Sequence, residues 1–116
     1  MTATAATYPV PLEEQTGPLW DSLRGVMDPE LPVSLVDLGL VYDVRESASG
    51  EVEVDLTFTA SGCPCMAFIK MDLEEALLAV DGVSGVTIHE VWNPPWTRSR
   101  VSPAGRERMK KFGVGL

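Results

Sequence analysis

The stretch EVEVDLTFT, residues 51–59, decides the fold because polar and apolar side chains alternate along it without a break. Its apolar side chains fall on one face of an extended chain, and its acidic and hydroxyl side chains fall on the other. This pattern predicts a strand over 51–59 with one buried face and one face toward solvent. LVYDVR, residues 40–45, predicts a second strand, and the turn composition of SASG, residues 47–50, predicts that the two form an antiparallel hairpin.

The residues before the hairpin predict one helix followed by a loop. Pro18 is typical of a first helical position, and apolar residues at helical spacing extend this helix to about Met27. DPELP, residues 28–32, ends the helix because residues that precede proline avoid the right-handed helical conformation. Residues 33–38 are then expected to form a loop or a short turn that leads into the first strand.

The residues after the hairpin predict a helix, a strand and a second helix. Apolar residues recur at helical spacing over 66–80, and Gly82 is suited to end that helix. Residues 86–92 predict a third strand, and Ser102-Pro103 predicts the start of a short basic helix that runs to about residue 111. The elements together predict a small α+β domain ordered helix, strand, strand, helix, strand and short C-terminal helix. Its helices should pack on one face of a three-stranded mixed or antiparallel sheet.

Length and composition restrict the class of protein. The 116 residues suit a single domain, which we assign to residues 16–116 after a flexible lead-in over 1–15. No apolar run approaches the roughly 20 residues that a membrane span needs, and the N-terminal residues lack the features of a signal peptide. Two cysteines separated by one proline make a poor structural disulfide, so a reducing cytoplasm is the expected compartment.

Charge is distributed unevenly along the chain, whose formal net charge is −8. Residues 1–90 hold three basic and sixteen acidic residues, a net charge of −13, whereas residues 91–116 hold six basic residues and one acidic residue, a net charge of +5. An acidic body repels phosphate backbones, so nucleic-acid binding is not expected. The basic C-terminal segment either docks an acidic partner or forms a solvated face of the protein itself.

The only two cysteines, Cys63 and Cys65, lie between the strand pattern and the following helical pattern. A cysteine at the start of a helix faces unpaired backbone N–H groups and the positive end of the helix dipole, which favour the thiolate. The thiolate is the form that binds soft metals. A complete zinc site in one chain is not expected, because such a site needs four ligands and the single histidine, His89, lies in a predicted strand, where a structural role is expected. Metal or cluster binding shared across a homodimer or with a partner, a strained disulfide, and simple apolar packing all stay open.

Two further groups of residues have two interpretations each. Asp28, Glu30 and Asp37 cluster around two prolines and could act as paired carboxylates, or could cap the neighbouring loop and helix ends. WNPPW, residues 92–96, forms a rigid aromatic segment that could anchor a partner or cover the core.

Four motifs in order give the chain a family resemblance. They are DPELPV at 28–33, DLGLV at 37–41, LTFT at 56–59 followed by GCP at 62–64, and WNPPWT at 92–97. With these motifs the chain closely resembles the metal–sulfur cluster assembly factor family, which includes SufT-like and PaaD-like proteins. The resemblance covers about residues 16–114.

The resemblance implies a non-enzymatic role in the maturation of iron–sulfur proteins, with assembly machinery and client proteins as partners. It implies that Cys63 is the reactive cysteine and a transient ligand of iron or of an iron–sulfur cluster, in a pocket lined by Asp28, Glu30 and Thr59. Cys65 stands where relatives commonly carry a small or apolar residue, so its thiol could add a second ligand. Two alternatives from other classes stay open: a metal-free adaptor that recruits clients through the basic segment, and a small thiol–disulfide protein that uses both cysteines.

Overall fold

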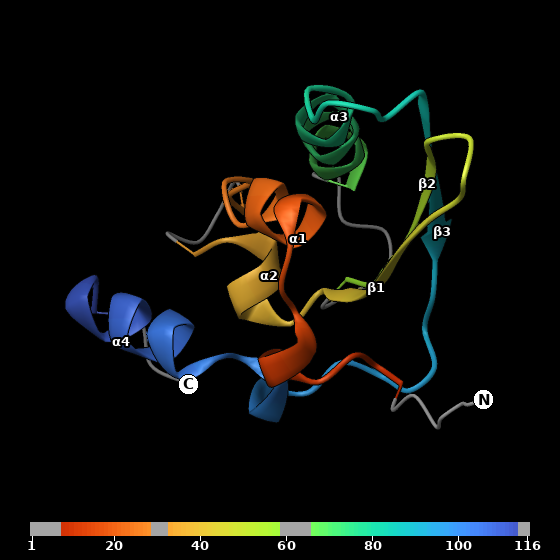
Figure 1. Ribbon diagram of the computed structural model, residues 1–116. Helices are drawn as coiled ribbons and strands as arrows, with labels where there is room; N and C mark the ends of the chain where they lie inside the picture. Colours follow the sequence, from red (N-terminus) through yellow and green to blue (C-terminus); the bar gives the residue numbers. More distant parts are fainter. Residues whose placement is uncertain (1–7, 29–32, 59–65, 114–116) are drawn as a thin grey trace.

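The computed structural model describes residues 8–28, 33–58 and 66–113 and forms an α+β fold (Figure 1). Its elements in chain order are the 3-10 helix η1 (Leu12–Glu14), α1 (Pro18–Leu23), α2 (Leu35–Leu38), β1 (Val41–Glu46), β2 (Glu51–Leu56), α3 (Met66–Leu78), β3 (Gly85–Glu90), the 3-10 helix η2 (Arg98–Arg100) and α4 (Pro103–Lys111). Figure 1 shows α1, α2 and α3 on one side of the sheet, as expected, with α4 beyond α2 at the end of the helical layer away from α3.

The three strands form one mixed sheet in the order β1-β2-β3. β1 and β2 are antiparallel, which confirms the predicted hairpin, and Gly50 closes the turn between them at a φ of 88°. β3 pairs with β2 in parallel, with Val52 opposite Val86 and Val54 opposite Ile88. A parallel pair needs a crossover connection, and α3 lies within it.

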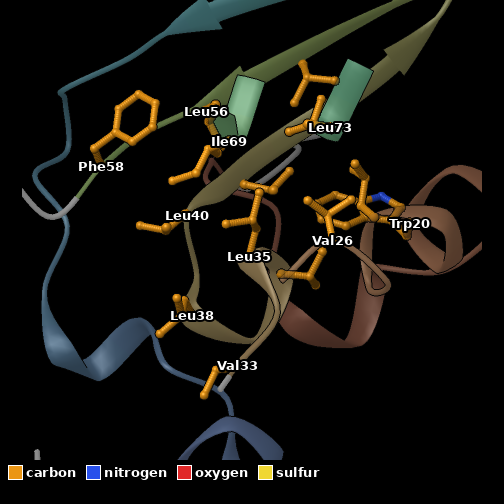
Figure 2. Packing of buried hydrophobic residues seen from close by; sticks show 14 of the residues in the cluster. Trp20, Val26, Val33, Leu35, Leu38, Leu40, Leu56, Phe58, Ile69 and Leu73 are labelled. Atoms are coloured by element: carbon orange, nitrogen blue, oxygen red, sulfur yellow. The ribbon is translucent and has the colours of Figure 1, made fainter. Parts of the chain in front are cut away.

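The core lies between the sheet and its covering helices. Figure 2 shows Leu35 and Leu40 pointing toward Leu56 and toward Ile69 and Leu73 of α3. All of these side chains are at most 4% exposed, so the alternating pattern in β2 and the helical stripe in α3 bury the faces that the sequence predicts. Burial of this apolar surface is the main favourable term in the folding of the domain.

The first helix ends at Leu23, so the prediction that it continues to Met27 is wrong. The amide of Gly25 donates to the carbonyl of Ser22, and the amide of Val26 donates to that of Leu23, which tightens the chain into a turn. Val26 is only 5% exposed. Its helical spacing therefore reflects burial beside the helix and not membership of the helix.

Residues 35–38 form the short helix α2, so the prediction of a loop or turn at 33–38 is wrong for these residues. The Ser34 hydroxyl accepts from the amide of Asp37 and caps the helix start, and Gly39 ends it at a φ of 79°. A single turn is too short to give an apolar repeat, so only its two caps could have predicted it.

Other element ends differ by a few residues from their predictions. β2 ends at Leu56, although the amide of Thr57 still donates to the carbonyl of Leu40. α3 ends at Leu78, and β3 spans 85–90 where 86–92 was expected. The basic helix is confirmed at 103–111, with Ser102 as its N-cap and proline at its first position.

Candidate functional site

Of the residues expected to form the pocket around the cysteines, Asp28 alone falls within the described parts of the chain. Glu30, Thr59, Cys63 and Cys65 lie outside the described residues, so their roles stay predictions. The described residues that border the cysteine motif in sequence are the end of β2 with Phe58 on one side and the start of α3 on the other.

The backbone around Asp28 is held by pairing with residues 33 and 34. The Asp28 amide donates to the carbonyl of Val33 at 3.0 Å, and Met27 forms an isolated antiparallel bridge with Ser34. Val33 is fully buried, whereas Asp28 is half-buried. The core therefore fixes the backbone on which Asp28 sits, and its side chain stays near the surface.

The start of α3 is firmly anchored and electrostatically positive. Ile69, Leu73 and Leu77 bury one face of this 13-residue helix in the core, and Met66 at its first position is half-buried against the same cluster. The first turn of α3 carries no acidic residue that would offset the positive end of its dipole. Cys65 directly precedes Met66 in sequence and lies outside the described residues.

Aromatic side chains lie at the other border of the cysteine motif. Phe58 is 4% exposed and lies at the edge of the buried cluster in Figure 2. The ring of Trp92 packs on it with the centroids 6.0 Å apart, while Trp92 itself is 43% exposed. The last described residue before the motif is therefore a buried aromatic side chain that Trp92 partly covers.

The two tryptophans of the WNPPW segment differ in their surroundings. The indole N–H of Trp96 donates to the carbonyl of Leu38 at 2.8 Å, and Trp96 packs against the core as a partly buried residue. The Tyr42 hydroxyl donates to the carbonyl of Pro94 at 2.6 Å and ties the segment to β1. Trp96 therefore covers the core, and Trp92 is the exposed tryptophan of the pair.

Asp37 has a structural role. Its carboxylate accepts from the Ser102 hydroxyl at 2.8 Å, and its carbonyl accepts from the Ser102 amide at 2.8 Å. Its own amide donates to the Ser34 hydroxyl at 3.1 Å. These bonds join the caps of α2 and α4, so Asp37 acts as a capping residue rather than as an acid or base.

Sequence reasoning missed a polar network on the sheet face opposite the helices. Arg45 donates to both carboxylate oxygens of Asp55, at 3.1 Å and 3.0 Å, and the Tyr8 hydroxyl donates to Asp55 at 3.0 Å. His89 pairs with Glu53 at 2.8 Å on the same face, in agreement with the structural role expected for it. The alternation in β2 and the register of the hairpin could have predicted that Arg45, Glu53 and Asp55 lie close together on one face. Nothing in the sequence predicts that Tyr8 joins them.

The network changes the pKa values of Tyr8 and Asp55. Burial and the hydrogen bond to Asp55 raise the pKa of Tyr8 to about 12. Burial alone would raise the pKa of Asp55, but hydrogen bonds from Arg45 and Tyr8 outweigh it and hold that pKa below its ordinary value. These groups stabilise the sheet, and they lie on the face away from the helical layer that contains α3.

Within the described ranges, no group of three or more histidine, cysteine, aspartate or glutamate side chains is arranged to hold a metal ion. None of the described helices has the length and apolar character needed to cross a membrane.

The chain matches the model of the iron–sulfur cluster assembly protein family over residues 19–89 and therefore belongs to that family. It is 40% identical over 95 residues to the Fe-S protein maturation auxiliary factor YitW of Bacillus subtilis, with 82% of this chain and 88% of YitW covered. It is 38% identical over 91 residues to the Fe-S protein maturation auxiliary factor SufT of Staphylococcus aureus, with 78% and 98% covered. Its fold matches the crystal structure of a domain of unknown function from Bacillus anthracis with a TM-score of 0.73 and 37% identity, over 84% of this chain and 90% of that one. The resemblance drawn from the four motifs is thus confirmed.

Proposed function

We propose that this protein is a cytoplasmic, non-enzymatic factor that helps to mature iron–sulfur proteins by carrying iron or a cluster as transient cargo. Membership of the iron–sulfur cluster assembly family carries the proposal. The names of its relatives YitW and SufT, both Fe-S protein maturation auxiliary factors, support it. The partners would be the assembly machinery and the client proteins, and a homodimer could share one cluster between two chains.

In this proposal Cys63 supplies the thiolate that binds the cargo, and Cys65 supplies a second thiol. Asp28, Glu30 and Thr59 would shape the surrounding pocket through hydrogen bonds, which tune both the basicity of the ligand and the release of the metal. The anchored, positively polarised start of α3 supports a thiolate next to it in sequence. A carrier has to release its cargo, so one or two thiolates suit the role better than a closed site with four protein ligands.

Anaerobic reconstitution with iron and sulfide tests the carrier role directly. Wild type, Cys63→Ala and Cys65→Ala are desalted, and iron per chain and visible absorption are measured. We expect wild type to retain a chromophore and Cys63→Ala to lose it, and the result for Cys65→Ala then decides whether the second thiol is a ligand. Circular dichroism confirms that each variant is folded. Failure of wild type to retain iron, or full retention by Cys63→Ala, would refute the proposed role of this thiol.

A metal-free adaptor is a second candidate, and the charge on α4 favours it. Within the part of the chain that the structure describes, Arg98, Arg106, Lys110 and Lys111 form no ion pair, although the protein as a whole is acidic. Such a surface attracts acidic partners at low ionic strength. If the adaptor role is correct, reversing Lys110 and Lys111 to Glu should impair maturation of a dependent iron–sulfur enzyme in cells, and Cys63→Ala should leave it unchanged. The carrier role predicts the opposite result for Cys63→Ala.

A further inference from the structure

Helix α3 has a second apolar face, directed away from the core. Phe68 and Met71 are each 64% exposed and Leu78 is 46% exposed, although one face of the helix is already buried. The three residues are spaced by three and seven positions, so they form a stripe along one side of the helix. Exposed apolar side chains that gather on one element, rather than scatter singly, mark an interaction surface.

The stripe has an acidic border. Asp72, Glu74 and Glu75 are exposed on the same helix and form no ion pair among the described residues. Lys70 is the basic residue of α3, and its ammonium group is already bonded to Glu90 of β3. The outer face of α3 therefore combines apolar contact area with negative charge that nothing in the described chain neutralises.

A groove extends this face toward the end of α1. It has a volume of about 500 Å³ and is lined by Met27, by Asp72 and Glu75 of α3, and by Ala79 just after that helix. Met27 is 40% exposed and directly precedes Asp28. The groove and the stripe thus form one surface, which we call the α3 face, and it reaches the residue next to a predicted site residue.

We propose that the α3 face docks a basic amphipathic segment of the protein that delivers or receives the cargo. This inference rests on the proposed carrier function. Lysine or arginine side chains of the partner would meet Asp72, Glu74 and Glu75, and apolar side chains would cover Phe68, Met71 and Leu78. Met27 and Met71 are flexible and polarizable, so the same surface can adapt to partners of different shape, which suits a factor that serves several proteins.

Neither this chain's own basic helix nor a symmetric second copy fits the α3 face. Helix α4 lies at the opposite end of the helical layer from α3 in Figure 1. A symmetric pairing of two α3 faces would set the acidic borders of both copies against each other, which disfavours association through like-charge repulsion. Charge complementarity therefore selects a basic partner protein as the occupant.

A peptide probe tests the proposal on the full-length protein. The probe is a synthetic amphipathic helix of leucine and lysine, compared with a leucine and glutamate peptide of the same apolar pattern, and affinity is read by fluorescence anisotropy. We expect the lysine peptide to bind and the glutamate peptide not to bind. Replacing both Glu74 and Glu75 by Lys should weaken the binding of the lysine peptide about tenfold.

Reversal of Glu13 and Glu14 to Lys is the matched control, because both residues are exposed acidic residues of η1 and the change in net charge is the same. This control should leave affinity within about twofold, which corresponds to a few tenths of a kcal/mol. An equal loss in both double variants would show only general attraction to an acidic protein and would overturn the proposal, as would failure of the lysine peptide to bind wild type.

The apolar part of the surface has its own control. Replacing both Phe68 and Met71 by Ser should also weaken the binding of the lysine peptide about tenfold, since both anchoring side chains are lost. Replacing Leu12, which is 46% exposed on η1, by Ser should not. Unchanged binding by the Phe68 and Met71 variant would overturn the assignment of the stripe.

Iron retention after reconstitution, measured on the same variants, separates the two proposals. Variants of the α3 face should keep the iron of wild type and lose only peptide binding. Intact peptide binding in a wild type that retains no iron would refute the carrier function and leave the docking surface standing. Normal iron retention with no peptide binding by wild type would refute the docking surface alone.

Discussion

At the scale of single residues, Gly39 joins two distant parts of the chain. It ends α2 at a φ of 79°, and a Cβ placed on it would lie 2.5 Å from the carbonyl oxygen of Arg100. The Gly39 carbonyl accepts from Nε of Arg100 at 2.9 Å, and the guanidinium of Arg100 lies 4.5 Å from the centre of the Tyr42 ring. Burial holds the pKa of Arg100 below its ordinary value. Glycine is needed here both for its backbone conformation and for the close approach of another segment.

Gly39→Ala should therefore lower the free energy of unfolding by about 3 kcal/mol or more, because strain in the left-handed conformation adds to a backbone clash. Gly82→Ala is the control, since Gly82 has a φ of 89° but no atom lies within 4 Å of the position that a Cβ would take there. It should cost only about 1 kcal/mol from strain. Urea denaturation measures both values, and equal losses would show that the contact with Arg100 is unimportant.

At the scale of elements, α3 has one face that packs in the core and an opposite face that is exposed to solvent. Its buried face holds Ile69, Leu73 and Leu77 in the core, and its outer face carries the apolar stripe with its acidic border. Stability should depend on the first face alone. The outer face is then free to be selected for recognition.

Leu73→Ala should lower the free energy of unfolding by about 2–5 kcal/mol, because Leu73 is fully buried and its loss leaves a cavity. Met71→Ala, two residues earlier on the exposed face, should change it by about 0.5 kcal/mol or less. Chemical denaturation of both variants checks the difference. A comparable loss for Met71→Ala would mean that the outer face contributes to the packing of the domain.

Elements with a long periodic pattern could be predicted from the sequence, and elements made by local or distant contacts could not. The strand at 51–56 and the helix at 66–78 repeat over several residues, and the basic helix carries a serine and proline start signal. Helix α2 has one turn and no repeat. The parallel pairing of β3 depends on how α3 packs, which the sequence pattern does not encode.

For the candidate site, the sequence predicted the family but not the contacts of the individual residues. Motif order identified the family, whereas the bonds of Asp37 and Trp96 join residues roughly 60 positions apart and leave no local signal. The two exposed apolar residues Phe68 and Met71 could be mistaken for core in a sequence, because an apolar residue alone does not show which face of a helix is buried.

At the scale of the whole molecule, the two faces of the sheet are stabilised in different ways. Helices bury the inner face with apolar side chains, as Figure 2 shows. The outer face is held by the network of Tyr8, Arg45 and Asp55, which also ties the N-terminal segment to the sheet, and the Val10 amide donates to the carbonyl of Tyr42 at 2.9 Å. The segment 8–15, which the sequence assigns to the lead-in, thus bonds to β1 and β2.

This network should make stability depend on pH through Asp55, whose side chain is 12% exposed. Its pKa is lower in the folded protein than the ordinary value of 3.8, so the ionised carboxylate contributes stability above pH 3.8 that is lost as the pH falls through the folded pKa. Asp55→Asn should cost about 1–3 kcal/mol at pH 7, and its difference from wild type should shrink below pH 3.8.

Urea denaturation between about pH 7 and about pH 2.5 measures this dependence. Glu51→Gln is the control, because Glu51 is an exposed carboxylate of the same strand. It should track the wild-type curve at every pH. A constant difference between Asp55→Asn and wild type over the whole range would contradict the role given to the Asp55 carboxylate.

The mixed sheet also orders the steps by which the chain folds. The β1–β2 hairpin closes across the short turn at 47–50, whereas β3 can pair with β2 only after the long connection that contains α3 has returned along the sheet. Loop-closure entropy and the slow formation of non-local pairings place this second step later. Cys63 belongs in sequence to that later-closing connection. On a chain emerging from the ribosome, the hairpin therefore forms before the pairing of β3 closes the connection that carries the thiol.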